Sequence, residues 1–503
     1  MNFDNTFARE LQGCFLPVVP APAPRPRELF FNAELADELG GDAAQWPLER
    51  RLTVFSGNEV PGGAQPIAQA YAGHQFGGFS PQLGDGRALL LGEVIDTLGR
   101  RRDIAFKGSG RTPFARGGDG KAAVGPMLRE VLVSEALHAL GVPTTRALAV
   151  MATGDWVHRE KPLPGAVLTR VAASHLRVGT LEFFAARGDV VRLKRIAQYA
   201  WARHGSADVE DPALALLELV VQRQARLVAQ WMALGFIHGV MNTDNMSISG
   251  ESIDFGPCAF MEAHDPGAVF SSIDHHGRYA YGNQPVVAQW NLTRLAQALL
   301  PAMKAEPEAA AEAAAEVLQR FAPEHEAALR GLWRERLGLK GAEEGANRHT
   351  LDRDGRHHAY GDRVEALVRG LHQLLQEQKV DHTLAWRRLC DAAQGDEAKW
   401  LALFARADGP KAWLQQWKVL RGGEAAARWD AAAAMRGANP FVIPRNHLVE
   451  RALAAASEEG DLQPFEKLLR AVRRPFEEAS ELQDYGQPAP LEVTACYRTF
   501  CGT

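Results

Sequence analysis

Three polar side chains near the middle of this sequence have the types and the spacing of a site for a metal-bound nucleotide. Asp244 and Asn245 end the loop at residues 238–245, His-Gly-Val-Met-Asn-Thr-Asp-Asn, and Asp254 follows in an Asp-Phe-Gly triplet. Carboxylate and amide oxygens are hard ligands that Mg²⁺ accepts alongside phosphate oxygens and water. We therefore expect Asn245 and Asp254 to hold a divalent cation that also binds a triphosphate.

Two charged residues upstream extend this set in an order known from protein kinases. Lys107 ends an apolar run at residues 104–106, like the lysine of the kinase Val-Ala-Ile-Lys strand, and Glu130 follows at about the separation of its kinase partner. The loop at 238–245 also has the length of the kinase catalytic loop, His-Arg-Asp-x-x-x-x-Asn. Each motif alone is weak, because strand-end lysines are usually solvated and Asn and Asp are common in turns. The complete set in the correct order favours a kinase-like nucleotide site.

A glycine-rich stretch, Gly84-Asp85-Gly86-Arg87, precedes the lysine strand. Glycines let a backbone approach phosphates closely and expose its N–H donors, and Arg87 could add positive charge. Gly-Asp-Gly is more often a hairpin turn, so the other motifs must support its interpretation as a nucleotide contact.

One departure from the kinase pattern bears on the type of reaction. Val240 stands where kinases place the aspartate that accepts the proton of the substrate hydroxyl, and the nearest acid is Asp244. Phosphate-handling residues are thus present without the usual geometry for transfer of the γ-phosphoryl group. We expect Asp244 to act as the general base and the site to handle its triphosphate differently.

The chain that must position these residues has three regions of different composition. Residues 1–165 are rich in Gly, Pro and β-branched residues and predict a small sheet with loops, the N-lobe. Residues 166–300 have longer helical patterns around the catalytic and metal-binding loops, the core of the C-lobe. Residues 301–503 are rich in Ala, Leu, Glu and Arg and predict a helical C-terminal region. The predicted fold is α+β, a protein-kinase-like two-lobed fold with a largely helical C-terminal extension.

Two helices have recognisable ends. Pro126 favours the first turn of a helix that carries Glu130 and ends at Leu140, before Gly141. A second helix is predicted from Pro212 to Gly235, where it delivers the chain into the loop at 238–245.

Bulk composition excludes several classes of function. With 503 residues, 46% hydrophobic and 23% charged, the chain has the composition of an ordinary soluble globular protein. A net charge of -5 argues against broad binding of nucleic acid or anionic membranes, and we expect neither as a partner. The N-terminus has no leader pattern, and five scattered cysteines indicate a reducing compartment, so we expect a cytoplasmic protein.

Several longer strings closely resemble the signature blocks of the selenoprotein O family of protein adenylyltransferases, the YdiU group. They are Tyr-Ala-Gly-His-Gln-Phe-Gly at 71–77, Gln-Leu-Gly-Asp-Gly-Arg at 82–87, Phe-Lys-Gly-Ser-Gly at 106–110, Met-Asn-Thr-Asp-Asn-Met at 241–246 and Asp-Phe-Gly-Pro at 254–257. The resemblance implies a pseudokinase fold in which ATP binds flipped relative to kinases. It further implies transfer of AMP to Ser, Thr or Tyr hydroxyls of proteins, with Mg²⁺ or Mn²⁺ bound and pyrophosphate leaving.

The resemblance also implies roles for individual residues. Lys107 would bind phosphate and pair with Glu130, Asp244 would be the general base, and Asn245 and Asp254 would bind the metal. The residues that it places at the nucleotide are Gly84, Gly86, Arg87, Lys107, Asp119, Gly120, Arg170, Arg177 and Asp254. A triphosphate bound in a different position needs extra guanidinium groups, each of which can bind two phosphate oxygens at once.

The terminal Cys501 resembles the family's C-terminal Cys or selenocysteine, which is proposed to form a redox-sensitive disulfide with a cysteine of the activation segment. Cys258 is the only cysteine in that segment here, whereas Phe270 and Ser271 stand at the expected position. An equal alternative is a small buried side chain at Cys258 and a free tail at Cys501.

Three other functions stay open at this stage. A close variant would transfer UMP from UTP with Mn²⁺, and a conventional kinase would transfer the γ-phosphoryl group. A non-catalytic pseudokinase scaffold would only bind nucleotide, but the joint presence of Lys107, Glu130, Asn245 and Asp254 speaks against it.

Overall fold

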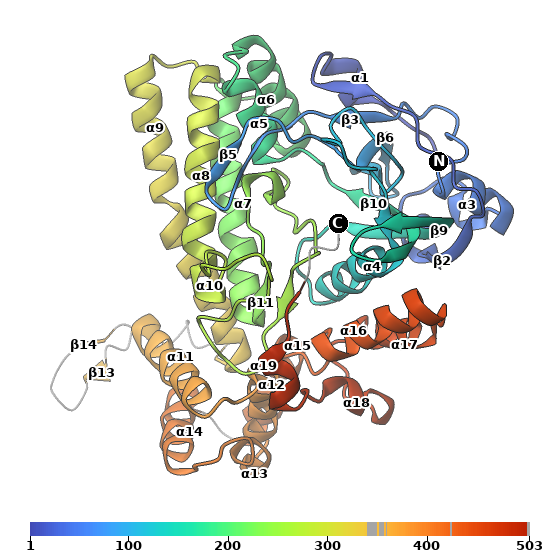
Figure 1. Cartoon of the computed structure of the whole chain (residues 1–503). Coiled ribbons are helices and arrows are strands. Elements are labelled where there is room, and N and C mark those ends of the chain that lie inside the picture. Colours follow the sequence, from blue (N-terminus) through green and yellow to red (C-terminus); the bar gives the residue numbers. More distant parts are fainter. Residues whose placement is uncertain (340–349, 352–356, 359, 423–424, 500–503) are drawn as a thin grey trace.

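The structure is a computed structural model that describes residues 1–339, 350–351, 357–358, 360–422 and 425–499. It combines one large antiparallel sheet with many helices, which confirms the predicted α+β class (Figure 1). Among the described residues, no helix is both long and apolar enough to cross a membrane.

The large sheet has eight strands in the order β1-β3-β6-β7-β10-β9-β2, with β8 paired to β10. Its strands are β1 (Phe15–Pro17), β2 (Arg27–Phe31), β3 (Ile67–Gln69), β6 (Ala88–Ile95), β7 (Arg101–Lys107), β8 (Ala122–Ala123), β9 (Arg146–His158) and β10 (Pro162–Ala172). Two-residue and three-residue strands form three further ribbons, β4 (Gly73–Gln75) with β5 (Gly78–Ser80), β11 (Phe236–Ile237) with β12 (Ala259–Phe260), and β13 (Thr350–Leu351) with β14 (His357–His358).

Successive side chains of a strand point to opposite sides of the sheet, and in the central strands the side chains on both sides are buried. On β6, Leu89 and Leu91 join one apolar cluster, whereas Leu90 joins another. On β7, Phe106 and Ala105 divide between the same two clusters. This double burial explains why the runs at 88–91 and 104–106 are continuously apolar, and it fixes Lys107 at the strand end opposite Leu168 of β10.

Helix α4 (Val124–Ala139) packs against the sheet through β9 and β10. The helix begins at Val124, two residues before the predicted start at Pro126. Pro126 still lies in the first turn, where a missing N–H breaks no hydrogen bond of the helix. Its other face meets α16 and α17 in a shared apolar cluster, so the helix is covered on both sides (Figure 1). Glu130 is buried within this helix and must therefore have a charged partner.

Four helices contribute many of the buried side chains of one large apolar cluster. They are α5 (Val178–Ala185), α6 (Val190–His204), α7 (Pro212–Leu234) and α8 (Gln284–Leu299). The bounds of α7 confirm the prediction: Asp211 accepts hydrogen bonds from the first turn, and Gly235 ends the helix with a left-handed φ of 75°. The chain then enters β11 and the loop at 238–245.

The remaining helices lie at the two ends of the chain. They are α1 (Thr6–Glu10), α2 (Ala33–Glu38), α3 (Leu48–Phe55), α9 (Pro307–Gln319), α10 (Phe321–Arg336), α11 (Tyr360–Glu377), α12 (His382–Ala393), α13 (Glu397–Leu401), α14 (Asp408–Arg421), α15 (Ala425–Ala438), α16 (Asn446–Ala454), α17 (Gln463–Val472), α18 (Gln483–Gly486) and α19 (Leu491–Cys496). In Figure 1, α7, α8 and α9 stand side by side, while α11 to α14 lie below them.

The N-cap of α7 provides a test of how this helix is held. Replacing Asp211 with Ala removes the acceptor for the Ala213 and Leu214 amides and for the Lys304 amide, and it should lower the free energy of unfolding by at least about 1 kcal/mol. Urea denaturation would measure the loss. The control is Asp208→Ala, an exposed aspartate of the same loop, and an equal loss in both variants would contradict the capping role.

Candidate functional site

A cleft of about 720 Å³ opens between the sheet and the helices that follow it. The cleft is lined by twelve residues that the sequence singled out. They are Gly84, Gly86, Arg87, Lys107, Asp119, Gly120, Glu130, Arg170, Arg177, Asp244, Asn245 and Asp254. Residues from more than five separate segments are thus brought to one place, whereas Cys258 does not line the cleft.

Asp254 is the centre of the polar contacts in this cleft. Its Oδ1 accepts from Lys107 Nζ at 2.7 Å and from Arg170 at 2.7 Å, and its Oδ2 accepts from Arg177 at 3.1 Å. Lys107 Nζ also donates to Glu130 Oε1 at 2.6 Å. Burial alone would raise the pKa of Asp254, but the three cations hold it well below its usual value.

Each cation comes from a different element, so the cluster depends on the whole fold. Lys107 ends β7, Arg170 lies on the neighbouring β10, and Arg177 immediately precedes α5. Both arginines are buried, although by composition alone such residues are usually exposed. Glu130 accepts a further bond from the backbone amide of Phe255 at 3.2 Å, which fastens the Asp-Phe-Gly segment to α4.

The backbone of Asp254 is itself strained. Its φ of 65° lies in the left-handed region, which costs a non-glycine residue about 1–3 kcal/mol. Three ion pairs to its carboxylate offset that cost, because a single unfavourable residue persists only where its surroundings fix it.

Asp244 is buried in the short 3₁₀ turn η2 (Thr243–Asn245) beside the cleft. Gln75 donates to its Oδ2 at 3.2 Å, and no described residue donates to its Oδ1. Burial raises the pKa of Asp244 to about 6, although the Arg177 charge opposes the shift. A Cβ at position 73 would clash with this carboxylate, so Gly73 is required for the close approach of β4.

The loop at 238–245 is braced by the β4–β5 ribbon. The His74 amide donates to Thr243 Oγ1 at 2.7 Å, and the Phe76 amide donates to Asn242 Oδ1 at 3.2 Å. Tyr279 donates to the same Asn242 oxygen at 2.6 Å, and its hydroxyl accepts from the Phe76 amide at 3.0 Å. The ribbon includes residues 73–77 of the block at 71–77, and its hydrogen bonds hold the loop at 238–245 in place.

Asn245 and Asp254 suit a divalent cation. The Asn245 amide nitrogen donates to the Val240 carbonyl at 3.1 Å, and no described residue donates to its side-chain oxygen. With a carboxylate on Asp254, the pair supplies the hard oxygen atoms that Mg²⁺ and Mn²⁺ bind. The residues present therefore fit such an ion.

The glycine-rich stretch forms one wall of the cleft. It is not a hairpin turn of the sheet, because β5 before it pairs with β4 rather than with β6. Gly84 has a φ of 73°, and a Cβ there would clash with the Phe114 ring. Asp119 lies opposite, where Arg159 pairs with it at 3.0 Å. The segment at 110–121 is thus packed against the glycine-rich stretch.

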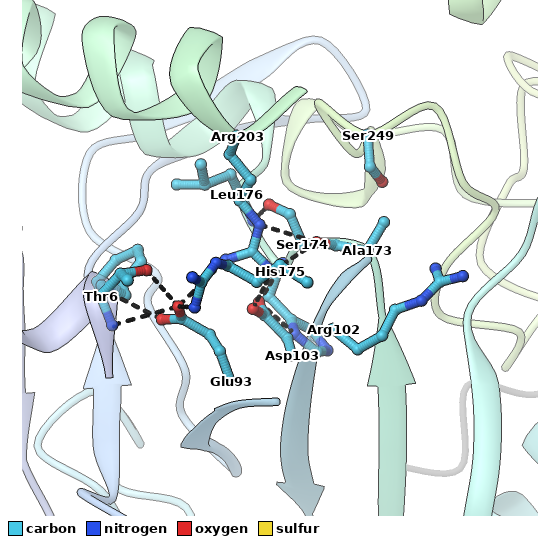
Figure 2. A network of polar contacts seen from close by, with 12 residues as sticks. Thr6, Glu93, Arg102, Asp103, Ala173, Ser174, His175, Leu176, Arg203 and Ser249 are labelled. Carbon is cyan, nitrogen blue, oxygen red and sulfur yellow. Dashed lines mark hydrogen bonds and ion pairs between the residues drawn. The ribbon is translucent and has the colours of Figure 1, made fainter. Parts of the chain in front are cut away.

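Arg170 is supported by a buried polar network that includes His175 and Asp103, two residues that Figure 2 shows close together. His175 Nδ1 lies 3.0 Å from Asp103 Oδ2, and Arg170 Nε donates to His175 Nε2 at 3.2 Å. Burial lowers the pKa of His175 to about 4, so the ring is neutral and Nε2 keeps a lone pair for Arg170. Figure 2 shows Arg203 reaching from α6 to Asp103, which balances the charge of that carboxylate.

The same network continues to the N-terminus. Arg203 and Arg101 both lie close to Glu93 of β6, at 3.9 and 3.0 Å. Glu93 also accepts hydrogen bonds from the backbone and hydroxyl of Thr6, which Figure 2 shows on the far side of the network. The N-terminal helix α1 is thereby tied to the strands that carry the cleft residues.

Of the two cysteines in the predicted disulfide, the structure describes only Cys258. Cys258 is buried, its thiol donates to the Phe255 carbonyl at 3.1 Å, and burial raises its pKa to about 12. Such a thiol is unreactive at neutral pH. Cys501 lies outside the described residues. The chain just before it pairs with the segment after Asp254, since the Thr499 amide donates to the Phe270 carbonyl at 2.8 Å.

Some residues of the site were not identified from the sequence. Gln75 reaches Asp244 across 169 residues, and His175 reaches Asp103 across 72. The signature block at 71–77 was a signal for Gln75, whereas no motif indicated His175 or Asp103.

Comparisons with known proteins agree along the whole chain. A family model described as protein adenylyltransferase SelO matches residues 1–473. The protein nucleotidyltransferase YdiU of Chromobacterium violaceum is 56% identical over 490 residues, which covers 97% of this chain and 99% of that protein. The proteins of the same name from Cereibacter sphaeroides and Agrobacterium fabrum are 53% and 51% identical, over 505 and 509 residues. Both alignments cover 100% of this chain and at least 99% of the relative.

The support that His175 gives Arg170 can be tested directly. His175→Phe removes the acceptor for Arg170 Nε and should weaken the affinity for ATP about tenfold, the value of one charged hydrogen bond. Calorimetric titration would measure it. His175→Gln, which keeps a donor and an acceptor, should retain more affinity, and equal weakening in both variants would indicate general destabilisation instead.

Proposed function

The chain belongs to the SelO family of protein adenylyltransferases, and from this membership we propose that it transfers AMP from ATP to Ser, Thr or Tyr hydroxyls of other proteins. The chain is a protein nucleotidyltransferase, as its relatives' names indicate. The proposal extends this to the nucleotide, the acceptor and the residues that act. The observation that carries it is the contact of Asp254 with two buried arginines in addition to the lysine.

We propose further that the sheet and the helices form a kinase-like pair of lobes. The N-lobe would comprise about residues 1–165, the C-lobe core 166–300 and the helical region 301–503, so that β10 (Pro162–Ala172) crosses the first boundary. In support, Lys107 on a sheet strand pairs with Glu130 on the adjacent helix, as in kinases.

The proposed nucleotide lies flipped relative to a kinase nucleotide. Arg170 and Arg177 would bind the relocated phosphates in addition to Lys107, because these three cations form ion pairs with only two carboxylates, those of Asp254 and Glu130. The described lining of the cleft as a whole holds ten Lys and Arg residues and six Asp and Glu residues. That excess of positive charge suits a polyanion. The remaining nucleotide contacts in the proposal are Gly84, Gly86, Arg87, Asp119 and Gly120.

Asn245 and Asp254 would hold the divalent ion, Mg²⁺ or Mn²⁺. When bound, such an ion neutralises phosphate charge and orients the triphosphate. The hydrogen bonds that Lys107 and the two arginines now make to Asp254 could then pass to phosphate oxygens.

Asp244 would act on the acceptor. The Asp244 carboxylate, which lines the cleft, accepts the proton of the substrate hydroxyl while the hydroxyl oxygen forms a bond to the α-phosphorus of ATP. The bond from the α-phosphorus to the bridging oxygen breaks, and pyrophosphate leaves with the negative charge. Lys107, Arg170 and Arg177 stabilise that charge. Val240 is apolar and buried, so it offers no base at the kinase position.

Labelled ATP separates nucleotidyl transfer from phosphoryl transfer. With Mg²⁺ and a mixed protein lysate, covalent label should come from α-labelled ATP and not from γ-labelled ATP. Asp254→Ala should abolish it, because the metal ligand and the partner of three cations are lost. Asp208→Ala, an exposed control, should label as the unmodified protein does, whereas label from γ-ATP alone would establish a kinase and overturn the proposal.

The dependence of activity on pH tests the role of Asp244. A base must be ionised, so kcat/KM should fall as the pH drops below about 6, the raised pKa of this carboxyl. Gln75→Leu removes the hydrogen bond that favours the ionised form, and it should shift the acid limb to higher pH. The exposed Gln82→Leu should leave the profile in place, and an unshifted Gln75→Leu profile would argue that Asp244 is not the titrating base.

A further inference from the structure

Three histidines converge at a junction outside the cleft. His264 follows β12, His372 lies in α11, and His382 begins α12. One ring nitrogen from each lies within 4.8 Å of the other two, and none of the three lines the cleft. The cluster therefore joins the segment after Asp254 to the helical C-terminal region, and the proposed transfer reaction makes no use of it.

The spacing of the rings suits a shared ion. The Nδ1 atoms of His264 and His382 are 3.1 Å apart. Two nitrogens bound to one tetrahedral Zn²⁺ at about 2.0–2.1 Å would be about 3.3 Å apart. The His372 ring stacks on His264 with 4.3 Å between ring centroids and 24° between ring planes, so the His372 ring must turn out of the stack before its nitrogen can bind the same ion.

The neighbourhood also needs a polar occupant. His372 Nε2, Trp386 Nε1 and Arg336 Nη1 are buried, and no described residue makes a hydrogen bond with any of them. They lie together, since the Trp386 ring is 6.2 Å from the His372 ring and 4.3 Å from the Arg336 guanidinium. Buried polar groups are nearly always hydrogen-bonded, so three unpaired groups in one neighbourhood indicate a polar ligand there.

The charges around the cluster define what that ligand can be. Burial lowers the pKa of all three histidines, to about 4 for His264, so their rings are neutral and have lone pairs at neutral pH. Arg336 is the cation whose charge acts on His372 and His382, and Asp265 is the anion whose charge acts on His264. Because Arg336 opposes a bare dication, the fourth ligand should be an anion such as hydroxide or chloride.

We propose that His264, His372 and His382 bind one divalent transition-metal ion, with Zn²⁺ the best fit and an anion as its fourth ligand. Three imidazoles suit Zn²⁺ better than Mg²⁺, which requires oxygen ligands. The anion gives the unpaired Arg336 Nη1 an acceptor and reduces the charge of the site. The ion would have a structural role, because it adds a bond at a junction that the backbone hydrogen bonds from His382 to Glu262 at 2.7 Å and from His264 to Val380 at 3.1 Å already cross.

The experiment uses the full-length protein after chelation and addition of Zn²⁺. We expect one tightly held equivalent per chain by elemental analysis, a higher melting temperature than the metal-free protein, and visible absorption bands of tetrahedral Co²⁺ when Co²⁺ replaces Zn²⁺. His372→Ala should lose the equivalent and the Co²⁺ bands. His325→Ala, a buried histidine outside the cluster, should keep both.

A further variant separates this site from the cleft. Asp254→Ala should keep the Zn²⁺ equivalent, since the proposed cleft metal has different ligands. If a histidine variant fails to fold, the Zn²⁺ content and the Co²⁺ bands of the unmodified protein still test the proposal. No tightly held Zn²⁺, or an equivalent that persists in His372→Ala, would overturn the proposal and leave the three histidines as a neutral stack that holds water only.

Discussion

The carboxylate of Asp254 is the point on which this structure depends. Burying a carboxylate is costly unless cations and hydrogen bonds surround it, and here one lysine and two arginines do so. Those cations belong to β7, β10 and the start of α5, so one side chain fastens the sheet to the helices after it. The strained backbone of Asp254 is tolerable for the same reason.

This arrangement also makes the cleft responsive to a polyanion. Lys107, Arg170 and Arg177 outnumber Glu130 and Asp254, and the second support of Arg170 is a neutral histidine rather than another carboxylate. A protonated His175 would present a donor to the Arg170 donor, so its low pKa preserves the contact. Asp103 and Arg203 balance each other behind it, which leaves the excess charge on the side that faces the cleft.

The sequence allowed much of this to be predicted where a local rule applies. Asp211 with Pro212 and Gly235 set the ends of α7, and the apolar run before Lys107 identified its strand, because caps and periodicity act over a few residues. Contacts between distant segments could not be predicted in this way. Nothing local marks His175 as the partner of Asp103, or Arg177 as buried, and the burial of Arg177 follows only from packing of the complete fold.

The two cleft aspartates show how packing assigns chemistry to identical side chains. Three cations hold the pKa of Asp254 well below its usual value, so it stays an anion and suits a metal at every physiological pH. Asp244 receives one side-chain hydrogen bond, from Gln75, and burial raises its pKa to about 6. A carboxylate with that pKa is ionised at neutral pH and still basic enough to accept a proton. Environment thus separates the two acids by pKa, and this separation is the physical reason why we propose Asp244 as the base and Asp254 as the metal ligand.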